Sequence, residues 1–234
     1  PTAMSPIADH LQAVRQRIDR AALACGRDPA AITLMAVSKT FDAGAVQAAI
    51  DAGHAVFGES YVQEAIAKID ALRAAPGQLA WHFIGPLQSN KARPVAEYMD
   101  WVHSIDRLKI AQRLSDLRPD SLGPLQVCLQ VNIDNEPTKS GVAPPDVLAL
   151  ARAVHGLPRL RLRGLMAIPA PSDDPTVQRA AFARLAALQR QLQDGGLPVD
   201  TLSMGMSDDL EAAVAEGATI VGVGTAIFGA RGYA

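Results

Sequence analysis

The sequence predicts one α/β domain over residues 1–234, a closed (β/α)8 barrel of the TIM type with an extra helix at its N-terminus. Short apolar runs alternate with helical patterns about eight times, which is typical of a parallel sheet covered by helices. The length of 234 residues suits one such barrel. No linker, low-complexity segment or block of charge divides the chain, so we expect a single domain.

The first predicted strand, Ile32–Val37, favours a parallel sheet because it is apolar almost throughout and does not alternate with polar residues. An open doubly wound sheet is the alternative fold. Such a sheet commonly carries a glycine-rich turn after its first strand, whereas Ser38-Lys39-Thr40 follows here. The barrel is therefore the preferred interpretation.

The extra helix is predicted to start at Ser5-Pro6, because serine is a favoured N-cap and proline a favoured first helical residue. Apolar residues then recur at helical spacing up to Gly26, which suits a C-cap. The other main helices are predicted at Ala43–Ala52, Ser60–Ala74, Gln88–Tyr98, Pro144–His155, Pro175–Gln193 and Asp208–Glu216, with one more ending near Leu117. The later strands are predicted at Ala55–Phe57, Trp81–Ile84, Trp101–Ser104, Leu125–Val131, Leu160–Met166, Thr201–Met204 and Ala218–Val223, before a closing tail at Ile227–Ala234.

Composition excludes several classes of function. A formal net charge of −2 leaves no basic excess for a nucleic-acid partner. No apolar run approaches the ~20 residues of a membrane span, and no signal-peptide pattern opens the chain. Cys25 and Cys128 are too few for a disulfide framework or a zinc site, and both are expected to be small buried residues. We therefore expect a protein of the reducing cytoplasm without a bound metal.

Lys39 is the first candidate for a functional residue. It follows a buried strand at its C-terminal end, where parallel α/β folds place their chemistry. An apolar environment favours the neutral form of an amine, and a neutral amine can form a Schiff base with an aldehyde. The alternative interpretation is that Lys39 ends the strand and points into water.

Two loops that should lie near Lys39 suggest a phosphate site. In a closed barrel the eighth strand pairs with the first, which brings Gly224-Thr225-Ala226 beside the lysine. The loop after the seventh strand contains Ser207, predicted as the N-cap of a helix whose N-terminus would bind an anion. Barrels often hold phosphate with these two loops. A phosphate site beside a Schiff-base lysine fits pyridoxal 5′-phosphate (PLP), although the same residues could be ordinary turn glycines and a cap.

Other polar residues are expected to be structural. His82 alternates with apolar neighbours and is interpreted as a hydrogen-bonded histidine of the barrel. His54 and His103 are expected near element boundaries and have no metal-ligand spacing. Glu59 and Glu64 flank a predicted helix start, where carboxylates interact favourably with the helix dipole.

These motifs resemble the YggS/PROSC family, the pyridoxal-phosphate homeostasis proteins. The segments that carry the resemblance are Ala36–Thr40, Phe57–Glu64, His82–Gly85, Ser104–Asp106, Val131–Ile133, Gly164–Met166, Leu202–Ser207 and Gly224–Gly229. They follow one another in order over nearly the whole chain. The resemblance implies a barrel similar to the N-terminal domain of alanine racemase.

The resemblance also implies a function. PLP would be held as an aldimine on Lys39, with the phosphate bound by Ser207, Gly224 and Thr225. The protein would take part in intracellular PLP homeostasis without strong catalytic turnover. Its partners would be PLP itself and PLP-requiring apoenzymes, with no membrane or nucleic-acid partner, and we expect a monomer. The expected cofactor-binding residues are Lys39, Ser60, Met166, Ser207, Gly224 and Thr225.

Two positions depart from the family pattern. The family usually has asparagine where this chain has Ser60, and arginine near the pyridine nitrogen where this chain has Gly222. A PLP-dependent racemase or lyase and a barrel aldolase are the alternative functions. A racemase needs a base on each face of the cofactor ring. In alanine racemase a tyrosine of a second domain supplies one base, and no such domain is expected before the chain ends at Ala234.

Overall fold

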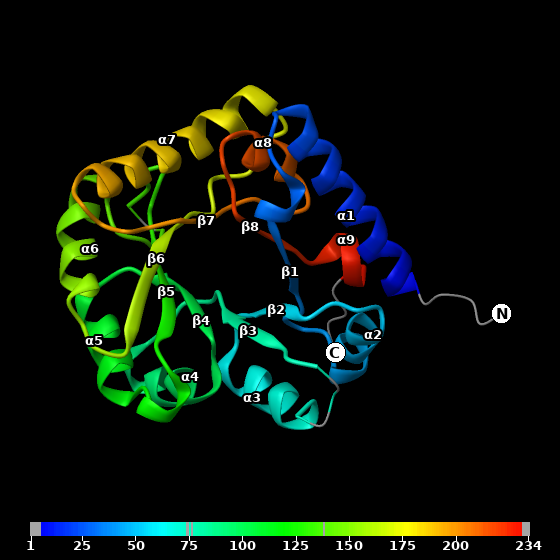
Figure 1. The fold of residues 1–234 in the computed structure, drawn as a ribbon, viewed down its shortest axis with the longest axis horizontal. Helices are drawn as coiled ribbons and strands as arrows, with labels where there is room; N and C mark the ends of the chain where they lie inside the picture. The colour runs from blue at the N-terminus through cyan, green and yellow to red at the C-terminus, as the bar shows by residue number, and fades with distance from the viewer. Residues whose placement is uncertain (1–5, 74, 76, 138, 231–234) are drawn as a thin grey trace.

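The computed structural model describes residues 6–230, apart from residues 74, 76 and 138. Eight parallel strands close into a barrel in chain order, and helices surround it (Figure 1). The strands are β1 Thr33–Val37, β2 Val56–Glu59, β3 Ala80–Phe83, β4 Trp101–Ile105, β5 Leu125–Gln130, β6 Leu160–Met166, β7 Thr201–Ser203 and β8 Ile220–Val223. The α-helices are α1 Pro6–Ala24, α2 Ala43–Asp51, α3 Val62–Ala71, α4 Ala92–Tyr98, α5 Leu108–Leu117, α6 Val147–His155, α7 Pro175–Asp194, α8 Leu210–Ala215 and α9 Thr225–Phe228. The predicted barrel with an N-terminal helix is confirmed.

Barrel closure brings the first and last strands together. β8 pairs with β1 in parallel, with Val223 opposite Ala36, and β1 pairs with β2, with Val37 opposite Gly58. The segments that follow these three strands therefore emerge at the same end of the barrel. Helix α1 packs against α2, α8 and α9, so it covers the seam between the first and last strands (Figure 1).

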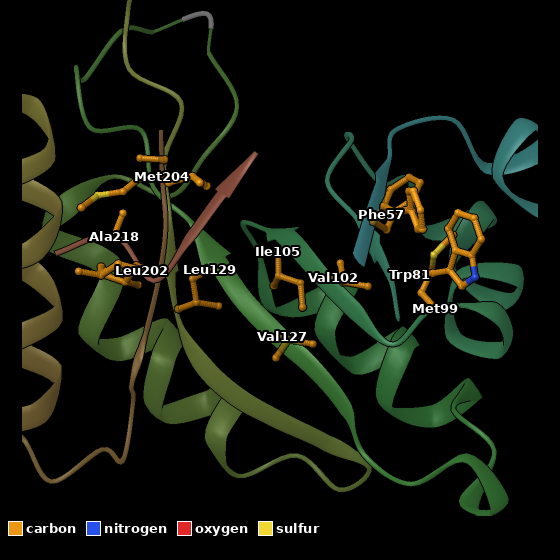
Figure 2. Packing of buried hydrophobic residues seen from close by; sticks show 14 of the residues in the cluster. Phe57, Trp81, Met99, Val102, Ile105, Val127, Leu129, Leu202, Met204 and Ala218 are labelled. Carbon is orange, nitrogen blue, oxygen red and sulfur yellow. The ribbon is translucent and has the colours of Figure 1, made fainter. Parts of the chain in front are cut away.

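The main hydrophobic core lies between the barrel wall and the surrounding helices. Phe57, Trp81, Val102 and Leu129 are among its buried side chains (Figure 2). Burial of one such side chain stabilises the fold by roughly 1.5–3 kcal/mol. β1 is buried at all but its first residue, because one face meets this core and the other faces the barrel interior. That double burial is the reason why the four residues after Thr33 are all apolar.

Several predicted boundaries differ from the structure. The segment after β8, expected as a loop and tail, forms the short helix α9, and Phe228 in it stacks on Phe41 at 5.0 Å between ring centroids. A four-residue helix is too short to produce a periodic pattern, so the sequence contained no signal for it. Cys25 is exposed, contrary to the prediction, whereas Cys128 is buried. Ser5, Ala74 and residues 231–234 lie outside the described residues.

Within the described part of the chain, no helix combines the length and the apolar character that crossing a membrane requires.

Candidate functional site

A cavity of about 280 Å³ opens at the C-terminal end of the barrel. Its lining comes from the ends of the strands and from the loops that follow them. It includes every residue expected from the sequence to contact a cofactor, namely Lys39, Ser60, Met166, Ser207, Gly224 and Thr225. Apolar side chains of Met35, Val37 and Ile84 complete much of the wall. The fold thus gathers six residues that are distant in sequence around one space.

Lys39 lies in a tight turn directly after β1 and is half-buried. The next residue, Thr40, has a φ of 71°, in the left-handed region that a β-branched residue rarely adopts. Two hydrogen bonds hold this turn: the Thr40 amide donates to Glu64 Oε1 at 2.6 Å, and the Phe41 amide donates to the Ser38 carbonyl at 3.1 Å. The backbone on the C-terminal side of Lys39 is therefore fixed.

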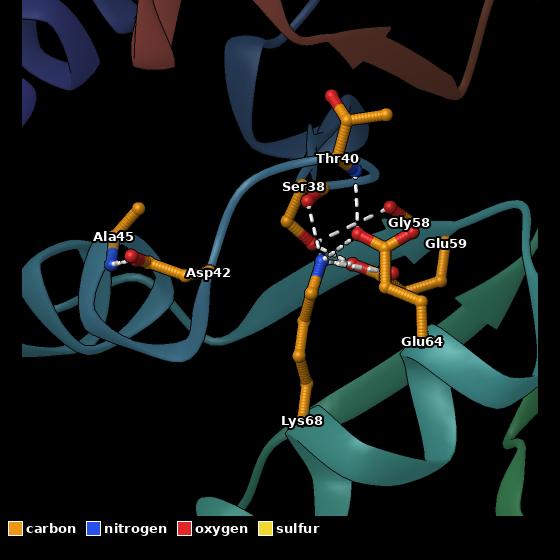
Figure 3. A network of polar contacts seen from close by, with 8 residues as sticks. All are labelled: Ser38, Thr40, Asp42, Ala45, Gly58, Glu59, Glu64 and Lys68. Carbon is orange, nitrogen blue, oxygen red and sulfur yellow. Dashed lines mark hydrogen bonds and ion pairs between the residues drawn. The ribbon is translucent and has the colours of Figure 1, made fainter. Parts of the chain in front are cut away.

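The backbone on the other side of Lys39 is held by a buried ion cluster (Figure 3). Lys68 Nζ donates to the Ser38 carbonyl at 2.6 Å and pairs with Glu59 Oε2 at 3.0 Å and Glu64 Oε1 at 2.9 Å. The Ser38 hydroxyl donates to Glu59 as well. We call Ser38, Glu59, Glu64 and Lys68, with the turn that they hold, the lysine wall of the cavity.

Burial has a measurable consequence for this cluster. Glu59 is fully buried and Lys68 is 5% exposed. Desolvation raises the pKa of Glu59 above its usual range, and the neighbouring Lys68 and Ser38 offset this only in part. Glu59 and Glu64 flank the start of α3, as predicted. However, Glu59 is the last residue of β2 and its carboxylate lies in the ion cluster, where a charge left unpaired would be costly.

The loops after β7 and β8 form the part of the cavity next to the Lys39 turn, because β8 pairs with β1. The hydroxyl groups of Ser207 and Thr225 lie 3.4 Å apart, and Gly224 precedes the first turn of α9. The first backbone N–H groups of a helix have no partner within it, so they are available to a ligand. We call Ser207, Gly224 and Thr225 the hydroxyl wall.

Ser207 is not the helix N-cap that the sequence suggested. Helix α8 begins at Leu210, after Asp209. The carboxylate of Asp209 instead accepts from the Met206 amide at 2.7 Å and closes the turn that contains Ser207. Gly205, just before this turn, has a φ of 101°, and a Cβ there would lie 2.6 Å from Ala213 Cβ. Only glycine lets the chain turn at this place.

Helix α1 supports both loops of the hydroxyl wall from outside. Arg17 Nη2 donates to the Ser207 carbonyl at 2.9 Å and pairs with Glu211 Oε1 at 2.6 Å. Nearer the N-terminus of α1 than Arg17, His10 Nδ1 lies 2.8 Å from the carbonyl oxygen of Ile227 in α9. The extra helix is therefore connected to the site, which the sequence did not indicate.

Comparison with known proteins identifies the family. The model of the family described as "Alanine racemase, N-terminal domain" matches residues 10–232. The pyridoxal phosphate homeostasis protein of Pseudomonas aeruginosa is 61% identical over 230 residues, which are 98% of each chain. This chain belongs to the family of pyridoxal phosphate homeostasis proteins. The Escherichia coli K12 protein of the same name is 54% identical and covers 98% of this chain and 99% of its own.

Solved structures agree with this family assignment. PipY of Synechococcus elongatus PCC7942 with PLP bound superposes with a TM-score of 0.83 at 38% identity, covering 95% of this chain and 99% of that one. A protein from Bifidobacterium adolescentis reaches a TM-score of 0.89 at 37% identity, covering 95% and 94%. The alanine racemase of Clostridium difficile 630 shares the barrel fold, with a TM-score of 0.69 at 14% identity over 94% of this chain and 56% of its own.

The structure shows what surrounds Gly222, the position at which the resemblance led us to expect an arginine. A Cβ at Gly222 would lie 3.0 Å from Met35 Cε and 3.3 Å from Val37 Cγ2. The thioether of Met35 therefore occupies the space next to this position. A larger residue at position 222 would have to displace the flexible end of that side chain, and the cavity wall is apolar here.

Reasoning from the sequence missed three polar features of the site. Ser203 and Asp208 also line the cavity. His103 was expected near an element boundary. Instead it lies in the middle of β4, where it is fully buried and hydrogen-bonded to His82. A serine within the apolar run Thr201–Met204 was a signal that could have been noticed. Among the described residues, no group of three or more histidine, cysteine, aspartate or glutamate side chains could hold a metal ion.

Proposed function

We propose that this protein binds PLP in the cavity at the barrel mouth, holds it as a Schiff base on Lys39 and takes part in PLP homeostasis. The observation that carries the proposal is the lining of one cavity both by Lys39 and by the group Ser207, Gly224 and Thr225. PLP has an aldehyde for the first and a phosphate for the second. The relative PipY, 38% identical, has been solved with PLP bound.

The residues present suit this ligand. The cavity of about 280 Å³ is of a size for one small ring compound, and Met35, Val37 and Ile84 offer apolar walls to an aromatic ring. On the hydroxyl wall, the side chains of Ser207 and Thr225 and the N–H groups at the start of α9 can donate to a phosphate.

Each residue then has a definite task. When bound, PLP supplies an electrophilic aldehyde and an electron-withdrawing ring. The amine of Lys39 would condense with that aldehyde and release one water molecule. Ser60 and Met166 would contact the ring, because both line the cavity. The lysine wall would hold the attachment point still while the hydroxyl wall binds the phosphate.

We propose further that turnover of amino acids is weak. A racemase requires a base on each face of the ring, and no tyrosine or histidine is among the described residues that line the cavity. Tyr61 is 53% exposed, and Tyr233 lies outside the described residues. Asp208 is a carboxylate on the lining and keeps a racemase or lyase as the second candidate. Turnover of L-alanine or L-serine by the PLP-loaded protein at ~1–10³ s⁻¹, lost in Asp208→Asn, would favour that candidate.

Exchange with other proteins fits the same geometry. Ile168 and Met206, which line the cavity, are 52% and 49% exposed, so the cavity has an accessible apolar rim. We propose that PLP-requiring apoenzymes approach this rim to receive the cofactor. Both cysteines are free thiols, which fits a reducing compartment.

The experiment that tests PLP attachment uses Lys39→Ala. The wild-type protein incubated with PLP should develop a visible absorption band, and borohydride reduction followed by peptide mapping should find the added mass on Lys39. Lys39→Ala should lose both signals completely. Lys109→Ala, which changes an exposed lysine of α5, is the matched control and should behave as wild type. A band that survives in Lys39→Ala would mean that another lysine is the anchor and that the assignment of the site is wrong.

A further inference from the structure

A line of polar side chains crosses the interior of the barrel beneath the cavity. Interiors of such barrels are usually filled by bulky branched apolar residues. Here His82 Nδ1 of β3 lies 2.8 Å from His103 Nε2 of β4, and His103 Nδ1 lies 2.7 Å from Ser203 Oγ of β7. All three residues are buried, with at most 6% exposure. We call these three residues the histidine relay.

The relay is anchored at one end and open to the ligand at the other. His82 stacks on Trp101 with 5.1 Å between ring centroids and 9° between ring planes. The guanidinium of Arg163 lies over the same indole at 4.8 Å and is paired with Asp200 at 3.0 Å. Ser203, at the other end, is part of the cavity lining. The orientation of the two imidazoles is therefore fixed, and Ser203 connects them to the cavity.

Both imidazoles are neutral at physiological pH. Burial lowers the pKa of His103 to about 3, and burial, with a smaller contribution from His103, lowers the pKa of His82 well below 6.5. A neutral imidazole has one N–H and one acceptor nitrogen. The hydrogen bonds of the relay can therefore run in only two directions.

The two directions give the hydroxyl of Ser203 different roles. In the first, His82 Nδ1–H donates to His103 and His103 Nδ1–H donates to Ser203, whose own O–H is left to donate into the cavity. In the second, the Ser203 hydroxyl donates to His103 and His103 Nε2–H donates to His82, so that Ser203 can only accept from the cavity. The relay holds the same number of protons in both states, and neither state places a charge in the barrel.

We infer that Ser203 is a hydrogen-bonding group for a polar ring atom of the bound heteroaromatic ligand, with His103 and His82 as its positioning residues. It donates when that ring atom is unprotonated and accepts when the ring atom carries a proton. The inference rests on the proposed function, since PLP is the ligand considered. It also explains why this barrel buries two imidazoles, whose desolvation apolar side chains would avoid.

The first test compares two buried serines. Ser203→Ala should weaken PLP binding roughly three- to tenfold and displace the pH midpoint of the absorption band of bound PLP. Ser203→Thr, which keeps a hydroxyl, should restore the wild-type midpoint. Ser104→Ala is the matched control, because Ser104 lies on β4 and its buried hydroxyl has no hydrogen-bond partner among the described residues. A Ser203→Ala protein with the affinity and midpoint of wild type would overturn the inference.

The second test observes the relay directly. Long-range proton–nitrogen NMR spectra of protein labelled at histidine should give neutral rings for His82 and His103 at neutral pH. PLP should shift the ring-nitrogen signals of His103 in wild type but not in Ser203→Ala. His54, buried outside the barrel interior with Arg15 and the Val56 carbonyl as partners, should not respond. An unresponsive His103 in protein that carries the visible PLP band would overturn the relay alone, whereas wild type without any band would overturn the proposed function as well.

Discussion

The lysine wall and the hydroxyl wall adjoin each other at one cavity, because β8 pairs with β1, and they are held in different ways. In the lysine wall, Glu59 and Lys68 are almost completely buried, and charged hydrogen bonds fix the backbone on both sides of Lys39. In the hydroxyl wall, Ser207 is half-buried and Thr225 is exposed. Their hydroxyl groups are separated by 3.4 Å, a weak hydrogen bond.

The difference follows from what each wall must do under the proposed function. A covalent bond at Lys39 forms only if the amine is correctly oriented, so a rigid support there is useful. A phosphate brings its own strong acceptors, and a loop with free donors can adjust to it. We therefore expect the lysine wall to contribute mainly to folding stability and the hydroxyl wall mainly to affinity. The predictions below test this division, from the largest expected effect to the smallest.

The largest effect should come from Lys68→Met. It removes the cation from the buried cluster and leaves the carboxylate of Glu59 without a cationic partner. This loss should lower the free energy of unfolding by ~3–5 kcal/mol. Urea unfolding of the protein without PLP measures this change. Lys109→Met on the exposed face of α5 is the control and should stay within about 0.5 kcal/mol of wild type. Equal small effects of both variants would show that the lysine wall does not support the fold.

The next effect concerns the hydroxyl wall. Ser207→Ala and Thr225→Val should each weaken PLP binding by roughly 1.5–3 kcal/mol, the range for a hydrogen bond to a charged group. Affinity for pyridoxal, which lacks the phosphate, should hardly change, and neither should urea unfolding without ligand. If pyridoxal and PLP lose affinity equally, these residues support the loop and do not bind phosphate.

The pH dependence of Lys68→Met should sharpen the comparison further. Burial raises the pKa of Glu59 in the folded protein, and loss of the cation should raise this pKa further. A carboxyl with a raised folded pKa binds a proton more readily in the folded than in the unfolded state. Its contribution to stability is therefore present below the unfolded pKa and is lost as pH rises through the folded pKa.

Acidification should accordingly reduce the deficit of Lys68→Met relative to wild type. The change should reach ~1.4 kcal/mol per pH unit between the folded pKa of Glu59 in wild type and its higher folded pKa in the variant. The difference between the two proteins is the quantity to measure, because their buried histidines affect both equally. If Glu59 is replaced by glutamine in both proteins, the part of this pH dependence that comes from Glu59 should disappear. A stability deficit of Lys68→Met that grows on acidification would contradict the raised pKa of Glu59.

The smallest effect should come from Arg17→Met in α1. This variant removes the donor to the Ser207 carbonyl and should weaken PLP binding by about 0.5–1.5 kcal/mol through a looser hydroxyl wall. Arg20→Met, on the exposed surface of the same helix, should leave binding unchanged. Competition binding with pyridoxal separates the phosphate effect from a general loss of the fold.

Local patterns in the sequence were enough to predict much of this protein. The largely apolar run Ile32–Val37 indicated a buried parallel strand, and the lysine after it indicated the candidate site. Glycines and hydroxyl residues after the last two predicted strands indicated a second wall nearby. These inferences succeeded because strand burial, turn formation and the placement of loops at one end of a barrel depend on residues that are close in sequence.

Only the tertiary structure decided how the two walls are built. Lys68 reaches back from α3 to the end of β1, Arg17 connects α1 to a loop 190 residues later, and Ser203 meets His103 across 100 residues. No local pattern encodes such contacts, because they depend on the pairing of β8 with β1 and on which side chains point into the barrel. The raised pKa of Glu59 and the lowered pKa values of the two buried histidines follow from burial, and burial is a property of the folded chain alone.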